Sequence, residues 1–197
     1  MPEVSSAIRL IVGLGNPGPQ YEETRHNAGA WFVHELAKQS NVVLRLENKF
    51  FGFYAKLTLN QKECQLLIPT TFMNRSGASV AAVIKFYKIV PQEILVVHDE
   101  LDLPTGAAKL KQGGGHAGHN GLRDIISALG TADFLRLRLG IDRPADPARV
   151  SDYVLSRPNK IDEEKIKTAI HQALSILPDL MEGKVGQAMK TLHSTRS

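Results

Sequence analysis

The sequence is nearly free of cysteine, since Cys64 is the only one in 197 residues. A single thiol excludes an intramolecular disulfide and a cysteine-rich metal cluster, and it fits a reducing compartment. The N-terminus has no basic stretch followed by an apolar run, and no apolar run approaches the roughly 18 residues of a membrane span. We therefore expect a soluble, cytoplasmic protein with no membrane partner.

The chain also has no large excess of one charge. Lys and Arg number 24 against 20 Asp and Glu, which gives a net charge of +4 and a sequence pI near 9.2. This balance favours an anionic partner only mildly. Because no block of like charges marks a disordered basic arm, any anion must bind to a folded surface.

Signs of a second domain are absent as well. There is no internal repeat, no low-complexity segment and no Pro or Gly cluster long enough to be a linker. A chain of 197 residues with 43% hydrophobic content is long enough for one well-buried core. We predict a single domain over residues 1–197, with C-terminal helices from about residue 161 packed on the same core.

Short apolar runs alternate with segments of helical periodicity, which predicts an α/β fold. We expect a three-layer α/β/α sandwich around a mixed, mostly parallel sheet, with hairpin pairing between residues 51–59 and 64–68. The predicted strands cover residues 8–14, 42–46, 51–59, 64–68, 94–97 and 134–141. The predicted helices cover residues 25–39, 76–88, 121–129, 161–177 and 185–192, the first capped by Thr24.

Two segments are predicted to present charged side chains to solvent. In residues 134–141 the leucines alternate with Arg136 and Arg138, so both arginines are expected to face outward. The C-terminal stretch is expected to be a solvated helix face without assigned sites. Its charged or titratable residues are Lys184, Lys190, His193 and Arg196.

Polar residues follow three of the predicted strands. Asn16 lies after the first, Asn74 follows the strand that ends near Pro69, and Asp99 follows residues 94–97. Ligands of open α/β sheets bind beyond the carboxyl ends of strands, so these loops are predicted to converge on one crevice.

The run from Gly13 to Gly18 matches the dinucleotide pattern G-x-G-x-x-G after a strand, but the match is weak. Pro17 and Pro19 remove backbone donors and delay the helix whose free N–H groups would hold a pyrophosphate. The acidic residue expected about 20 positions later is also misplaced, since Glu47 lies too far along the chain. A nicotinamide enzyme, which would bind NAD or NADP, is therefore a hypothesis that we do not favour, and no cofactor is predicted.

His26 stands at the predicted start of a helix, beside the glycine-rich loop. That position lowers the pKa of a histidine and keeps the ring neutral, as a general base requires. A capping or packed histidine is the alternative. Asp99, Glu100 and Asp102 supply carboxylates that could orient such a base, but their spacing matches no known metal site.

Two further segments admit a structural and a functional interpretation. Phe72 and Met73 could be core residues and Asn74 a helix cap, or all three could contact a ligand. The glycines of GGGHAGHNG allow close approach of a ligand, and Lys109 and Lys111 would share one face of a strand, although a solvated strand and a flexible turn give the same pattern. The HxxH pair that ends at His119 is a weak metal signal.

Taken together, four stretches resemble the bacterial-type peptidyl-tRNA hydrolase family in order and spacing. They are VGLGNPGPQYEETRHNAG, PTTFMNRSG, HDELDLPTG and GGGHAGHNGLRDI, and the resemblance runs from about Leu10 to at least Leu177. It implies hydrolysis of the ester that joins a peptide to the 3′ end of tRNA, by a monomer without metal or obligate protein partner.

The resemblance also implies roles for individual residues. His26 would activate water, Asp99 would hold the tautomer of its ring, and Asn16 would help to select substrates whose amino group is blocked. The remaining matches to substrate contacts are Tyr21, Phe72, Met73, Asn74, His119 and Asn120. Contacts to tRNA phosphates are implied for Lys109, Lys111, Arg123 and Arg138.

A different class of function is an RNA-binding protein on the same scaffold that has lost catalysis. Its signature would be the loss of the base or of its partner. His26 and Asp99 are both present, which favours the enzyme.

Overall fold

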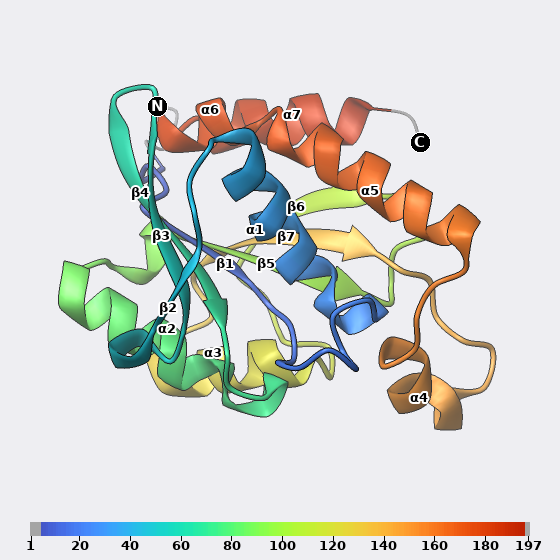
Figure 1. Ribbon diagram of the computed structural model, residues 1–197. Helices are drawn as coiled ribbons and strands as arrows, with labels where there is room; N and C mark the ends of the chain where they lie inside the picture. The colour runs from blue at the N-terminus through green and yellow to red at the C-terminus, as the bar shows by residue number, and fades with distance from the viewer. Residues whose placement is uncertain (1–4, 196–197) are drawn as a thin grey trace.

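The apolar runs of the sequence form a seven-stranded mixed sheet with strand order β2-β3-β4-β1-β5-β7-β6 in the computed structural model, which describes residues 5–195 (Figure 1). Its strands are β1 (Leu10–Gly13), β2 (Arg45–Glu47), β3 (Gly52–Leu59), β4 (Lys62–Pro69), β5 (Ile94–Glu100), β6 (Ala108–Gln112) and β7 (Leu135–Gly140).

The parallel part of the sheet is its centre. Strand β1 pairs in parallel with β4 and β5, and β5 pairs in parallel with β7. The outer strands β2, β3 and β6 run antiparallel to their neighbours. The predicted hairpin is formed by β3 and β4, where Asn60 and Gln61 take up the positive φ angles that a tight two-residue turn requires.

Helices cover both faces of the sheet, as predicted for a three-layer α/β/α sandwich (Figure 1). The apolar sides of α1 (Ala28–Gln39), α5 (Lys160–Leu174), α6 (Leu177–Met181) and α7 (Val185–Ser194) share one core cluster with the sheet. The other face packs against α2 (Ser76–Tyr87) and α3 (Asn120–Leu129). The short helix α4 (Val150–Val154) lies apart at one end of the sheet (Figure 1).

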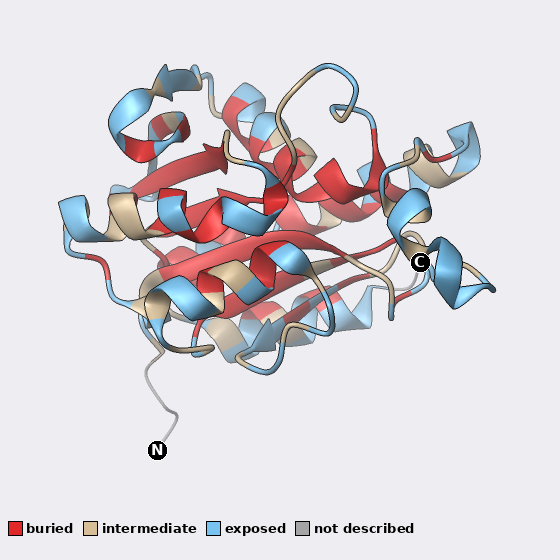
Figure 2. Cartoon of the chain, turned by 90° about the horizontal axis from the view of Figure 1, so that it is seen from below, coloured by how far each residue is buried: buried red, intermediate tan, exposed pale blue. Residues whose placement is uncertain are grey.

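Because both faces are covered, the central strands are buried on both sides (Figure 2). The prediction that Arg136 faces solvent is therefore wrong, since only 2% of this residue is exposed. Its guanidinium donates to the carbonyl oxygens of Gly114 and Gly115 at 2.6 Å each and stacks on the Phe134 ring. Arg138 is only partly exposed, and its Nε donates to a carboxylate oxygen of Glu100 at 2.8 Å.

The C-terminal segment differs from the prediction in two details. The expected helix over residues 161–177 is two helices, α5 and α6, with a break after Leu174. His193 is more than a solvated side chain, since its Nε2 accepts a hydrogen bond of 3.0 Å from the Leu110 amide of the edge strand β6. Arg196 lies outside the described residues. Within residues 5–195, no helix combines the length and apolarity needed to cross a membrane.

Gly29 allows α1 to pack closely on the strand ends that carry the polar loops. A Cβ at position 29 would lie 2.1 Å from the Val97 carbonyl oxygen and 2.7 Å from the Leu14 amide, both of them rigid backbone atoms. Helix α1 can approach the sheet this closely only with glycine at this position.

We predict that Gly29→Ala destabilises the protein by several kcal/mol, because a backbone clash in the core cannot relax locally. Gly186→Ala is the matched control, since a Cβ there has no neighbour within 4 Å and should gain about 0.5–1 kcal/mol of helix propensity. Urea unfolding of both variants tests this, and equal stabilities would contradict it.

Candidate active site

The carboxyl ends of the parallel strands open into one cleft of about 870 Å³. Asn16 follows β1, Asn74 follows β4 and Asp99 lies near the end of β5, and all three line this cleft. The predicted convergence of the three loops is thus confirmed. The cleft is also lined by five further residues to which the resemblance assigns a role: His26, Phe72, Met73, His119 and Asn120.

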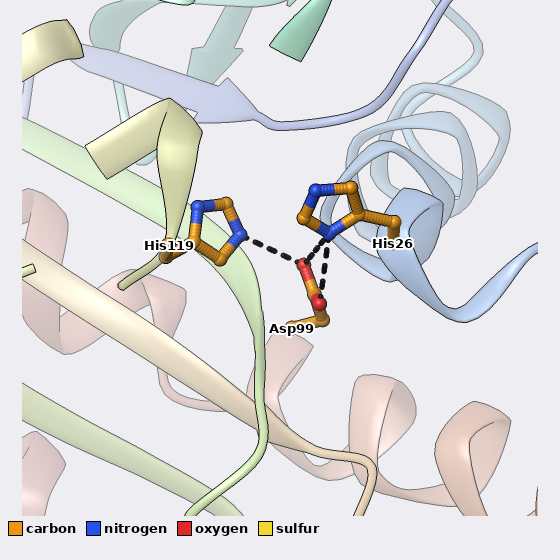
Figure 3. Close-up of side chains that lie close together, drawn as sticks. All are labelled: His26, Asp99 and His119. Carbon is orange, nitrogen blue, oxygen red and sulfur yellow. Dashed lines mark hydrogen bonds and ion pairs between the residues drawn. The ribbon is translucent and has the colours of Figure 1, made fainter. Parts of the chain in front are cut away.

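His26 is held by a short 3-10 helix, Arg25–Asn27, that leads into α1. Thr24 precedes this turn but makes no side-chain capping bond, and its hydroxyl donates instead to the Tyr21 carbonyl oxygen at 2.8 Å. The ring is buried, and its Nδ1 lies 3.0 Å from both carboxylate oxygens of Asp99 (Figure 3). Since an ionised carboxylate only accepts, Nδ1 carries the proton and Nε2 keeps its lone pair.

Burial and charge act on this pair in opposite directions. Burial by itself lowers the pKa of His26, but the charge of Asp99 and its hydrogen bond outweigh this effect and raise the pKa above its ordinary value. The prediction that the position at a helix start lowers the pKa of His26 is therefore wrong. For Asp99, burial alone would raise the pKa, whereas His26 and His119 hold the pKa of the carboxyl well below its usual range. Asp99 is thus a buried carboxylate that stays ionised.

His119 is the second imidazole on Asp99. Its Nδ1 accepts from the amides of Gly121 and Leu122 at 3.2 and 3.3 Å, which caps α3. Nδ1 therefore has no proton, and Nε2–H donates to Asp99 Oδ1 at 2.8 Å (Figure 3). Both ring nitrogens have partners within the protein, so His119 is used to hold Asp99 and the start of α3.

His98 packs against His119 from the interior of the sheet. Its ring lies 5.1 Å from that of His119, and its Nδ1 donates to the Asp99 carbonyl oxygen at 2.8 Å. Complete burial, followed by the proximity of His119, lowers the pKa of His98 to about 3. The ring is therefore neutral and packs edge-on against His119.

One group of side chains has the composition of a metal site, because donor atoms of His26, Asp99 and His119 all lie within 4.8 Å of one another. The hydrogen-bond pattern does not fit a metal, however. A metal on His119 Nε2 would move the ring proton to Nδ1, which already faces two backbone N–H donors. His116, the other half of the HxxH pair, instead accepts from the Gly118 amide.

Asn74 and Asn120 present exposed amides at the mouth of the cleft. Asn74 lies in a 3-10 turn, Met73–Arg75, before α2, and Asn120 is the first residue of α3. The two helix starts are joined by Asp124, whose carboxylate accepts from the Gly77 amide at 2.7 Å. Neither asparagine side chain has a hydrogen-bond partner among residues 5–195, which leaves both free for a ligand.

The predicted phosphate contacts lie outside the cleft. Lys109 and Lys111 are exposed on β6, and Lys109 pairs in register with Arg138 of β7. Glu100, which holds Arg138, does line the cleft. Arg123 is exposed on α3. Tyr21 also lies outside the lining, although its ring meets that of Phe72 edge-on at 6.4 Å.

One wall of the cleft was not predicted from the sequence. It is formed by the segment from Pro147 to Leu155, which includes α4. Arg25 anchors this segment by donating to the carbonyl oxygens of Tyr153 and Ser156, and its guanidinium lies 4.1 Å from the centre of the Tyr153 ring. Asp146 before Pro147 is a helix-start signal that could have revealed the segment.

A family model described as peptidyl-tRNA hydrolase matches residues 10–197. The chain belongs to the peptidyl-tRNA hydrolase family. It is 56% identical to a peptidyl-tRNA hydrolase of Pseudomonas putida over 98% of this chain and 100% of that one, and 53% identical to one of Azotobacter vinelandii with the same coverage. The predicted membership of this hydrolase family is thereby confirmed.

The fold agrees with a solved structure of the same family. The crystal structure of peptidyl-tRNA hydrolase from Acinetobacter baumannii superposes with a TM-score of 0.93 at 46% identity and covers 96% of both chains. At this similarity the family fold extends over nearly the whole chain.

Proposed function

We propose that this protein hydrolyses the ester between a peptide, or an N-blocked amino acid, and the 3′-terminal ribose of tRNA, with His26 as the general base. Membership of the peptidyl-tRNA hydrolase family supports the reaction. The observation that carries the mechanism is the pair of 3.0 Å contacts from His26 Nδ1 to Asp99, which leave Nε2 as a base facing the cleft.

In the proposed reaction, Nε2 of His26 takes a proton from water while the water oxygen bonds to the ester carbonyl carbon. The imidazolium formed is stabilised by Asp99, and the carbonyl oxygen becomes an oxyanion that accepts a hydrogen bond from an asparagine amide at the cleft mouth. When the C–O bond to the ribose breaks, the proton passes from Nε2 to the departing ribose oxygen. The products are tRNA with a free hydroxyl and a peptide with a free carboxyl.

Water is the proposed nucleophile because the one thiol of the chain is unsuited to the role. Cys64 is buried in β4 and is not part of the cleft lining. Burial raises the pKa of its thiol to about 12, so the thiolate is not formed near neutral pH.

We assign binding of the tRNA part of the substrate to two features at the cleft. Phe72 is 57% exposed and is braced by Tyr21, which suits stacking on a terminal base. The exposed cations Lys109, Lys111 and Arg123, together with Arg138, would contact phosphates and confer salt-dependent affinity. Met73, Asn74 and Asn120 are assigned to the acyl end beside His26.

We further propose that residues 1–197 form a single domain and that the protein acts as a cytoplasmic monomer, without cofactor, metal or obligate protein partner. A non-catalytic RNA-binding role is less well supported, because the hydrogen-bonded pair of His26 and Asp99 needed for catalysis is intact.

We predict that His26→Ala lowers kcat by about 10²–10⁴-fold on N-acetyl-aminoacyl-tRNA and leaves tRNA affinity nearly unchanged, because the base is lost while the residues assigned to the RNA are untouched. Release of the N-blocked amino acid is measured with a chelator present throughout. His34→Ala, an exposed histidine of α1 away from the cleft, is the control. Turnover by His26→Ala at the rate of the control would contradict the assignment.

The pH dependence should follow the ionisation of His26. A base must be unprotonated, so activity should fall as the pH drops through the raised pKa of His26. Asp99→Asn removes the negative charge that raises this pKa and leaves burial, which lowers it, so the acid limb of kcat/KM should move to lower pH.

The rate of Asp99→Asn should fall at every pH as well, because the tautomer is no longer fixed. Asp102→Asn serves as the control, since this exposed carboxylate pairs with Arg143 at 2.7 Å. An acid limb that stays in place in Asp99→Asn would show that His26 is not the titrating base.

A further inference from the structure

The start of helix α2 is bonded to the side of helix α3. Asp124 lies one turn into α3, and its carboxylate accepts a hydrogen bond of 2.7 Å from the backbone amide of Gly77. This amide belongs to the first turn of α2, where N–H groups have no partner within their own helix and where the helix dipole favours a negative charge. The bond joins residues 47 positions apart, and neither of them has a role in the proposed reaction.

Two glycines allow the helix starts to meet this closely. A Cβ at position 77 would lie 2.5 Å from the carbonyl oxygen of Asp124 and 2.7 Å from the Cβ of Ala128, so only glycine fits there. Gly121, in the first turn of α3, lies against the preceding turn of the other helix, since a Cβ there would lie 2.6 Å from the sulfur of Met73. The starts of α2 and α3 are thus packed closely on each other.

The bond at Gly77 acts on Asn74 through a well-braced turn. Asn74 is the middle residue of the 3-10 turn Met73–Arg75, which leads directly into α2. Ser76, the first residue of α2, is buried, and its hydroxyl donates to the Met73 carbonyl oxygen at 2.8 Å. A displacement of Gly77 would therefore move the whole turn, and Asn74 with it.

Helix α3 is the fixed side of this contact. Its start is capped by His119, whose Nε2–H donates to Asp99 at 2.8 Å, and the same carboxylate lies 3.0 Å from Nδ1 of His26. A continuous series of hydrogen bonds and helix backbone therefore runs from the base through α3 and Asp124 to the turn that carries Asn74.

The turn has a second tie, because the Met73 amide donates to the side-chain oxygen of Asn16 at 2.7 Å. A turn held at one point can pivot, whereas two ties fix its orientation. We propose that Asp124 is a positioning residue, which holds the amide of Asn74 at the place relative to His26 that the reaction requires. This inference rests on the proposed function, in which Asn74 contacts the acyl end of the substrate.

Asp124→Ala should lower kcat on N-acetyl-aminoacyl-tRNA by about 10- to 100-fold, since a displacement of about 1 Å in a group that contacts the substrate costs that much. The Kd for tRNA should stay within about twofold of wild type, because the cations assigned to the RNA are untouched. Asp124→Asn keeps a side-chain oxygen that accepts from the Gly77 amide, so its kcat should lie within about threefold of wild type. Wild-type kcat in folded Asp124→Ala would overturn the inference.

A double variant separates positioning of Asn74 from a general loss of structure. Adding Asp124→Ala to Asn74→Ala should lower kcat by less than about twofold further, because the amide that Asp124 positions is already absent. A structural defect would instead lower kcat by the same factor in both backgrounds. Multiplied losses would therefore overturn the inference.

Asp162→Ala is the matched control and should keep wild-type kcat. This half-buried aspartate also stands near a helix start and accepts from the side chain of Asn159, but it lies outside the cleft lining. If Asp124→Ala does not fold, Asp124→Glu replaces it, because it keeps the charge and moves the carboxylate by one methylene. It should lower kcat without adding to Asn74→Ala, and an unchanged kcat would overturn the inference. No cleavage by wild type would be a different result, because it would overturn the proposed function itself.

Discussion

The buried carboxylate of Asp99 is the group on which the rest of the site depends. It accepts from His26 on one side and from His119 on the other, at 3.0 and 2.8 Å. A buried charge is tolerated only with such partners, so removing either imidazole leaves a costly unpaired acceptor. The same carboxylate selects the tautomer of His26, and through His119 it fixes the start of α3, where Asn120 begins the helix.

The fold supplies this arrangement because parallel strands end at one edge of the sheet. Strands β1, β4 and β5 bring three chain segments together there, and close packing of α1 at Gly29 delivers His26 to the end of β5. The cations on β6 and β7 lie beside this edge and outside the cleft. The proposed catalytic residues and the proposed RNA-binding cations thus lie on adjacent parts of one surface.

Much of this could be predicted from the sequence. The periodicity of strands and helices predicted the layered fold. The positions of Asn16, Asn74 and Asp99 after predicted strands indicated that they share one cleft. Other features depend on tertiary contacts that periodicity does not contain. The alternation of residues in β7 predicted an exposed Arg136, yet its guanidinium is bonded to the loop that contains Gly114 and Gly115. Helix α4, which forms the unpredicted wall of the cleft, is too short to show helical periodicity in the sequence. The bond of Asp124 to Gly77 spans 47 residues and follows from the packing of α2 on α3.

Catalysis as proposed requires that neutral His26 carries its proton on Nδ1 and presents an unprotonated Nε2 to the cleft. Nitrogen-15 NMR of the histidine rings measures this directly, because the two tautomers have different nitrogen shifts. We predict a protonated Nδ1 above the pKa of His26, and a pKa above the ordinary histidine value. A proton on Nε2 in the neutral ring would contradict the assignment of His26 as the base, and a pKa below the ordinary value would contradict the effect of Asp99 on the ring.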